Sequence, residues 1–172
     1  MSAWQKILQS DALNQGDLLR AIKIPTVEES FPATDANGTV VINVIESDII
    51  VLSQSCDLEL DKLPNVVVAQ VFSIADFEAK NPGFQKSGKW KDVHRGRVEA
   101  LHLVCCPEAP EEPKQTLVVD FRQIASLPVG YIRRVADNSG ERWRLQPPYL
   151  EALSHAFGRF FSRVAVPDTV KI

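Results

Sequence analysis

The sequence has few cysteines, few histidines and no long hydrophobic segment, and each shortage excludes a class of protein. Three cysteines among 172 residues, of which Cys105 and Cys106 are adjacent, do not provide the framework of a disulfide-rich secreted domain. No apolar run approaches the ~20 residues of a membrane-spanning helix. The N-terminus lacks the charged and apolar regions of a secretory signal. These absences favour a protein of the reducing cytoplasm that does not enter a membrane.

Motifs for metals and phosphate-binding loops are also missing. The three histidines, His94, His102 and His155, lie in no metal-ligand spacing, and CxxC, HxxxH and HExxH do not occur. His102 and Cys106 share one face of a predicted strand, but zinc requires two further ligands. The eight glycines are scattered and form neither GxGxxG nor GxxxxGK. The sequence therefore predicts no metal and no cofactor.

The composition is that of an ordinary globular domain with an uneven distribution of charge. It is 45% hydrophobic and 24% charged, which excludes general disorder, collagen-like chains and coiled coils. The net charge is −3, yet residues 80–99 carry six cations against two carboxylates, and residues 131–163 carry six arginines against three carboxylates. Two basic segments permit a local anionic ligand on an acidic chain.

Hydrophobic patterning predicts a mainly β protein. Runs rich in β-branched residues predict strands over 18–22, 39–45, 48–52, 66–72, 98–106 and 116–121. Helical spacing predicts a short helix over 2–9 and a longer one from Pro148 to Val164, and residues 131–135 and 141–145 are predicted as an exposed hairpin. Residues 1–172 then form one domain, with 25–38 and 79–97 as inserted loops. The expected fold is a small, strongly bent β-barrel with a C-terminal helix and short additional helices.

Several short segments resemble a known family when they are taken in chain order. They are Gly16-Asp17 before the first strand, Ile49–Ser53, Val66–Val71, Leu117–Ile124 and the terminal helix. This order resembles the MazF/PemK-like toxins of toxin-antitoxin pairs. The resemblance implies an SH3-like barrel, a homodimer, an antitoxin-like protein partner and cleavage of single-stranded RNA without a metal.

The sequence departs from this family at the position of the catalytic arginine. The family's arginine lies just before the strand that ends in Val-Leu-Ser, where this chain has Glu46-Ser47-Asp48. Loss of such a stabilising donor costs about 3–4 kcal/mol of transition-state stabilisation, by analogy with an oxyanion hole. Arg20, Arg95 or Arg97 could replace it. Ser73 is the nearest match to the family's catalytic Ser or Thr.

The basic segment 86–97 provides candidates for RNA binding and catalysis. Trp90 among Lys86, Lys89 and Lys91 is a pattern that can stack on a base while the lysines follow phosphates. Beyond it, His94 is a candidate acid or base, and Arg95 and Arg97 are candidates for phosphate stabilisation. The alternative interpretation is a solubilising loop anchored by its tryptophan, with a solvated histidine.

A second candidate site is the polar segment Ser53–Leu58, which directly follows a predicted buried strand. Cys56 could act as a nucleophile or ligand activated by His94 or His102, with Asp57 orienting the imidazole and Gln54 or Ser55 donating hydrogen bonds. The alternative is that the polar residues form turns and caps and that Cys56 is a small buried residue.

Three functions therefore remain open. The first is a divergent MazF/PemK-like protein that binds single-stranded RNA and cleaves it without a metal. The second is a non-catalytic SH3-like barrel that serves as a protein-interaction or binding module. The third is an enzyme that depends on Cys56.

Overall fold

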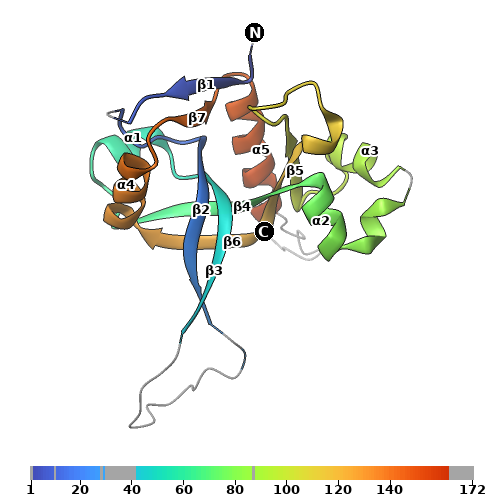
Figure 1. Cartoon of the computed structure of the whole chain (residues 1–172), viewed down its shortest axis with the longest axis horizontal. Coiled ribbons are helices and arrows are strands. Elements are labelled where there is room, and N and C mark those ends of the chain that lie inside the picture. Colours follow the sequence, from blue (N-terminus) through green and yellow to red (C-terminus); the bar gives the residue numbers. More distant parts are fainter. Residues whose placement is uncertain (1, 10, 28, 30–41, 87, 163–172) are drawn as a thin grey trace, which may run out of the picture.

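The computed structural model describes residues 2–9, 11–27, 29, 42–86 and 88–162 and contains one antiparallel sheet of seven strands with five α-helices (Figure 1). The strand order is β1-β7-β2-β3-β4-β6-β5. The strands are β1 Trp4–Ile7, β2 Asp17–Thr26, β3 Asn43–Val51, β4 Asn65–Ser73, β5 Leu101–Val104, β6 Leu117–Pro128 and β7 Arg142–Leu145. The helices are α1 Ser55–Glu59, α2 Ile74–Lys80, α3 Lys89–His94, α4 Val129–Asn138 and α5 Tyr149–Phe161, with 3-10 turns at Pro82–Gln85 and Pro113–Gln115.

The central strands are buried on both faces, which explains their nearly continuous apolar sequences. Ile49, Ile50 and Val51 of β3 are fully buried, as are Val68 and Ala69 of β4. One face of the sheet packs against α5. The other packs against α1 and α4, which lie together on the left of Figure 1. The predicted C-terminal helix is confirmed, and the overall class is mixed α/β.

The predicted closed barrel is not formed by the described residues. The end strands β1 and β5 each pair with one neighbour, β7 and β6, and not with each other. Side chains bridge the space between β1 and β5. Trp4 Nε1 donates to the Cys105 carbonyl at 2.7 Å, and both ends of the sheet contact α5. The sheet bends enough for both of its end strands to join one hydrophobic core. Contacts with α5 and with the Trp4 indole take the place of backbone hydrogen bonds between β1 and β5.

The predicted N-terminal helix is wrong, because residues Trp4–Ile7 form strand β1. Trp4 and Ile7 have the spacing of a helical turn, but four residues are too few to sustain a helix without tertiary support. They pair with β7 in the register Trp4↔Leu145 to Ile7↔Arg142. The backbone hydrogen bonds and the buried indole therefore decide the local structure.

The predicted hairpin over 131–145 is wrong in its first half, which is helix α4. Ile132 and Ala136, four residues apart, are buried against the sheet. Ser139 ends the helix and Gly140 follows it with φ +71°, the left-handed conformation that commonly terminates helices. The same Asn-Ser-Gly sequence is typical of hairpin turns and of helix ends, so the sequence did not distinguish them.

The segment 79–97, predicted as an inserted loop, is mostly helical. It contains the end of α2, a 3-10 turn and helix α3, which pack around Phe77 through Phe84 and Trp90. The other predicted loop, 25–38, begins inside β2, and its residues 28 and 30–38 lie outside the described residues. Hairpin β2–β3 projects from the body of the molecule (Figure 1). In the described part of the chain, no helix has the length and apolar character that crossing a membrane requires.

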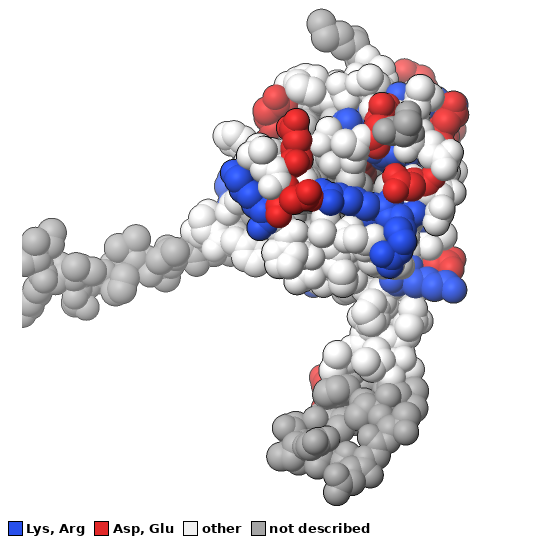
Figure 2. Space-filling model, turned by 90° about the vertical axis from the view of Figure 1, so that its left-hand side faces the viewer, with Lys and Arg blue, Asp and Glu red and all other residues white. Residues whose placement is uncertain are grey.

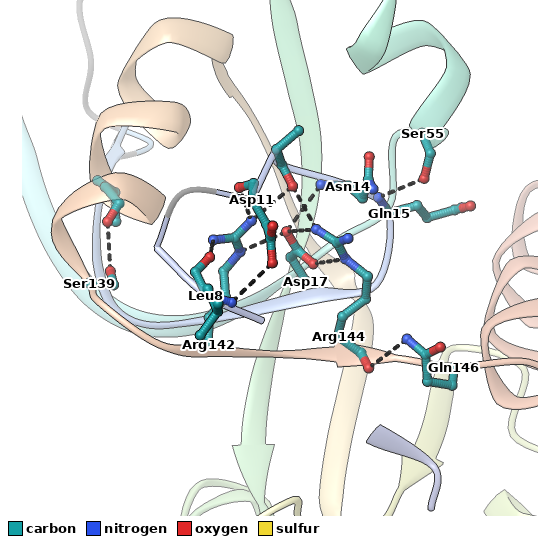
Figure 3. Close-up of polar contacts among 12 residues, drawn as sticks. Leu8, Asp11, Asn14, Gln15, Asp17, Ser55, Ser139, Arg142, Arg144 and Gln146 are labelled. Atoms are coloured by element: carbon teal, nitrogen blue, oxygen red, sulfur yellow. Dashed lines mark hydrogen bonds and ion pairs between the residues drawn. The ribbon is translucent and has the colours of Figure 1, made fainter. Parts of the chain in front are cut away.

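A buried ion cluster joins the start of β2 to β7 (Figure 3). Asp17 is fully buried and lies between two arginines, accepting from Arg142 Nε at 2.9 Å and from Arg144 Nε at 2.5 Å. Arg142 also donates to the carbonyls of Leu8, Asp11 and Ala12. The Gly16-Asp17 pair noted in the sequence therefore fixes the connection between β1 and β2.

Candidate functional site

A groove runs between α3 and α5, and β5 forms its floor. Figure 1 shows β5 between these two helices, and both helices contact it. The groove consists of two hollows of about 480 and 710 Å³ that share the lining residues His94 and Arg95. We call the smaller one the histidine hollow and the larger one the tyrosine hollow. The shared residues make them two parts of one depression.

Helix α3 forms the first wall and is held by an aromatic cluster. It starts after Gly88, whose φ of +90° reverses the chain. Val93 is buried, and the Trp90 ring lies 5.6 Å from that of Phe77 and 5.2 Å from that of Phe84. Trp90 Nε1 also donates to Glu78 at 2.7 Å. This anchoring directs the exposed end of α3, with His94 and Arg95, into the groove.

Helix α5 forms the second wall through one of its faces. Leu153 and Ala156 are buried toward the core. Tyr149, Ala152, His155 and Arg159 line the two hollows at successive spacings of three, three and four residues. These spacings keep the side chains on one face of a helix, over a length of about 15 Å.

All three histidines of the chain meet in the histidine hollow. His94 comes from the end of α3, His102 from β5 and His155 from α5. His94 and His155 are exposed, whereas His102 is partly buried. Imidazole is the side chain best suited to accept and release protons near neutral pH, so the two exposed histidines of the hollow are potential proton carriers.

His102 is held in its neutral form. Burial and, to a smaller extent, the nearby positive charge of Arg159 together lower the pKa of His102 to about 4. At neutral pH its ring therefore carries one N–H donor and one lone-pair acceptor. It can orient a bound group by hydrogen bonding without adding charge.

Two arginines supply positive charge to the same hollow. Arg95 and Arg159 are exposed, and neither forms an ion pair within 4 Å with a carboxylate among the described residues. Gly96 lies beside Arg159 with φ +69°, and a Cβ atom placed there would make an ordinary contact of 3.4 Å with the Arg159 guanidinium. The carboxylate of Glu99 also lines the hollow and offsets part of this charge.

The groove brings together some of the predicted site residues. His94 and Arg95 lie at its centre, and Trp90 and Lys91 line the tyrosine hollow. Lys89 is exposed at the start of α3, and Arg97 pairs with Asp92 at 3.2 Å. Sequence reasoning had not assigned Arg159, His155 or Tyr149 to a site. Their helical spacing was visible, but nothing in the sequence placed α5 beside α3.

The polar segment after β3 is separate from the groove linings. Cys56 is exposed on α1, and among the described residues its Sγ has one polar partner, Gln54 Oε1 at 3.9 Å. Ser55 accepts from the Gln15 N–H at 3.2 Å, and Asp57 faces Lys62 at 3.8 Å. No histidine is among these contacts. The Ser53 and Ser55 hydroxyls accept from the backbone N–H groups of Val67 and Gln15, and no side chain of the segment caps α1.

Ser73 caps helix α2. Its hydroxyl accepts from the Asp76 N–H at 3.0 Å and donates to the Asp76 carboxylate at 2.6 Å. The surrounding hollow also contains Glu46 and Asp48, so its charge opposes a phosphate. Lys80 also lines this hollow, and Arg20 is paired with Asp48 at 2.6 Å and with Glu108 at 2.9 Å.

The side of the molecule that carries α1 and α4 has balanced charge. Figure 2 shows Lys and Arg side chains next to Asp and Glu side chains on this face. Arg133 pairs with Asp61 at 2.6 Å, and Lys6 pairs with Glu141. This face therefore offers no extended basic surface to a polyanion.

Comparisons with known proteins do not assign the chain to a family. No protein-family model, no curated protein and no solved structure matches the chain. In the part of the chain that the structure describes, no cluster of three or more His, Cys, Asp or Glu side chains could hold a metal ion.

Proposed function

We propose that the protein binds single-stranded RNA in the α3–α5 groove and cleaves it without a metal, as a divergent relative of the MazF/PemK-like toxins in the cytoplasm. The observation that carries the proposal is the convergence of three histidines with Arg95 and Arg159 in one hollow. Paired proton carriers beside guanidinium groups are what transfer of a phosphoryl group requires.

The chemistry is attack of a ribose 2′-hydroxyl on the adjacent phosphorus. One of the exposed imidazoles, His94 or His155, takes the proton from the 2′-oxygen as the O2′–P bond forms. The other donates a proton to the 5′-oxygen as the P–O5′ bond breaks. The products are a 2′,3′-cyclic phosphate and a free 5′-hydroxyl, so atoms and charge balance without a co-reactant.

The two arginines stabilise the negative charge that develops on the phosphoryl oxygens. In this proposal Arg95 and Arg159 replace the arginine that the resemblance places at Glu46-Ser47-Asp48, three residues that lie within β3. Neutral His102 accepts or donates one hydrogen bond and orients the phosphate. The positively charged function thus moves from the central strand β3 to the ends of α3 and α5.

The direct test is incubation with a long single-stranded RNA in the presence of a chelator. Wild-type protein is expected to give fragments ending in 2′,3′-cyclic phosphate. His94→Ala and His155→Ala are each expected to lower the rate about 100-fold or more. Arg134→Ala is the matched control for Arg159→Ala, because Arg134 is an exposed arginine of α4 that lines neither hollow. Intact RNA with the wild type, or equal rates for the Arg134 and Arg159 variants, would contradict the proposal.

A second candidate function, as a protein-interaction module, is favoured by the projecting β2–β3 hairpin. Its described residues Val27, Ile42, Val44 and Ile45 expose 67%, 51%, 58% and 38% of their surface. In the described residues, the part of β2 after Leu18 and the part of β3 before Asp48 pair with no third strand, although the Tyr131 hydroxyl donates to the Lys23 carbonyl at 2.9 Å. We propose a second copy of the chain as the occupant. Light scattering should report a dimer, and Val44→Lys should give a monomer.

A further inference from the structure

We infer that the tyrosine hollow binds the base of the nucleotide next to the phosphate held in the histidine hollow. This inference rests on the proposed function, because the two hollows share His94 and Arg95. When a nucleotide's phosphate contacts Arg95, the attached nucleoside must lie on one of the two sides of Arg95. The larger, more apolar hollow lies on the side of Trp90 and Tyr149.

The lining of the tyrosine hollow fits a flat aromatic ring with a polar edge. Leu103, Val104 and Cys105 give it an apolar floor. Tyr149 stands at its rim with 44% of its surface exposed, and its hydroxyl has no hydrogen bond to the described residues. Such a ring can stack on a base without first breaking a packing contact.

Trp90 plays a different part from the one predicted by its place among lysines. Its ring packs against Phe77 and Phe84, and its N–H is taken by Glu78. It therefore forms a fixed wall of the hollow, whereas Tyr149 is the ring free to stack. Lys91 lines the same hollow and can contact the next phosphate along the chain.

One side chain can read the edge of the base. Thr116 lines the hollow, and its backbone carbonyl accepts from the Ile74 N–H at 3.0 Å, which fixes the position of the residue. A hydroxyl both donates and accepts, so it can form a hydrogen bond with any base. It favours one base over another only through the geometry of that hydrogen bond. The hollow therefore selects a nucleobase over an aliphatic group, with modest discrimination among bases.

The test compares two probes on the whole protein: inorganic phosphate, and a 2′-deoxy dinucleoside monophosphate that cannot be cleaved through a 2′-hydroxyl. Isothermal titration at low salt should show the dinucleotide binding wild-type protein at least tenfold more tightly than phosphate. Tyr149→Ala should remove about tenfold or more of that advantage and leave phosphate binding unchanged, whereas Tyr149→Phe should keep it. Thermal unfolding of each variant verifies that it is folded.

The outcomes separate this inference from the proposed function. Suppose that phosphate binds and that Arg159→Ala weakens this binding. The base subsite is then refuted, while the phosphate site stands, if the dinucleotide binds no more tightly than phosphate or if Tyr149→Ala leaves the dinucleotide's tighter binding unchanged. If neither probe binds, both proposals fail. Loss of phosphate binding in Tyr149→Ala would also refute the assignment, because it would show that Tyr149 supports the fold of the groove and not a base.

Discussion

Asp17 should contribute more to stability than any exposed ion pair in the molecule, and Asp17→Asn tests this. The side chain of Asp17 is fully buried, and its carboxylate accepts from the Asn14 N–H at 3.0 Å and from both neighbouring arginines, Arg142 and Arg144. The substitution keeps the shape but removes the charge, and it turns an amide N–H₂ toward groups that can only donate. Arg142, whose side chain is 1% exposed, is then a buried cation without a counterion.

The magnitude follows from this burial. Removing one partner of a buried, hydrogen-bonded ion pair costs about 3–5 kcal/mol. For a protein of this size, each kcal/mol corresponds to a shift in Tm of roughly 2–4 °C, so the expected loss is about 6–20 °C. Asp61→Asn is the matched control. Asp61 pairs with Arg133 at 2.6 Å but its side chain is 73% exposed, so the expected cost is below ~1 kcal/mol.

The assay is urea unfolding followed by circular dichroism, with the free energy of unfolding taken for wild type and both variants. We expect a large fall in the free energy of unfolding for Asp17→Asn and almost none for Asp61→Asn, at an unchanged m-value. Equal losses in the two variants, or a loss below ~1 kcal/mol for Asp17→Asn, would refute this expectation. That result would mean that the backbone carbonyls around Arg142 alone are sufficient to stabilise its charge.

Three further predictions concern the groove and its surroundings. Because the pKa of His102 is about 4 in the folded state and near 6.5 when unfolded, unfolding takes up a proton between these values, so stability should fall by up to ~3 kcal/mol from pH 7 to pH 4. His102→Gln should flatten this slope in unfolding measured against pH. Gly96→Ala should cost about 1 kcal/mol in thermal unfolding and weaken RNA binding, since φ is +69° there and a Cβ atom would approach Arg159; Gly83→Ala, with no atom within 4 Å, should change neither. Ser73→Ala should cost about 1 kcal/mol of stability through the lost helix cap and leave RNA cleavage unchanged, and a loss of cleavage in this folded variant would relocate the catalytic site.

Local signals in the sequence were reliable where one physical effect dominated. The apolar runs 48–52 and 66–72 are buried strands, because a strand covered on both faces has no need of polar residues. The start of the terminal helix after Pro147-Pro148 is also as predicted. Each of these features depends on neighbours within a few residues.

Prediction from the sequence failed where distant contacts decided the outcome. Residues 4–7 are a strand because β7 lies beside them, and residues 129–138 are a helix because the sheet buries Ile132 and Ala136. The sheet stays open because α5 and Trp4 occupy the space between its end strands. The closing ladder of a barrel requires backbone contacts between these strands, and their sequences do not specify whether another element intervenes.

For the candidate site, the sequence by itself determined the chemistry that is available: histidines and arginines in a basic segment and on a terminal helix, with no metal or nucleotide-binding motif. Only the tertiary structure decided that His94, His102 and His155 share one hollow with Arg159. These residues lie on α3, β5 and α5, and their approach depends on how two helices pack over an end strand. Packing of this kind is set by side-chain volume and burial across the whole fold, which no spacing along the chain records.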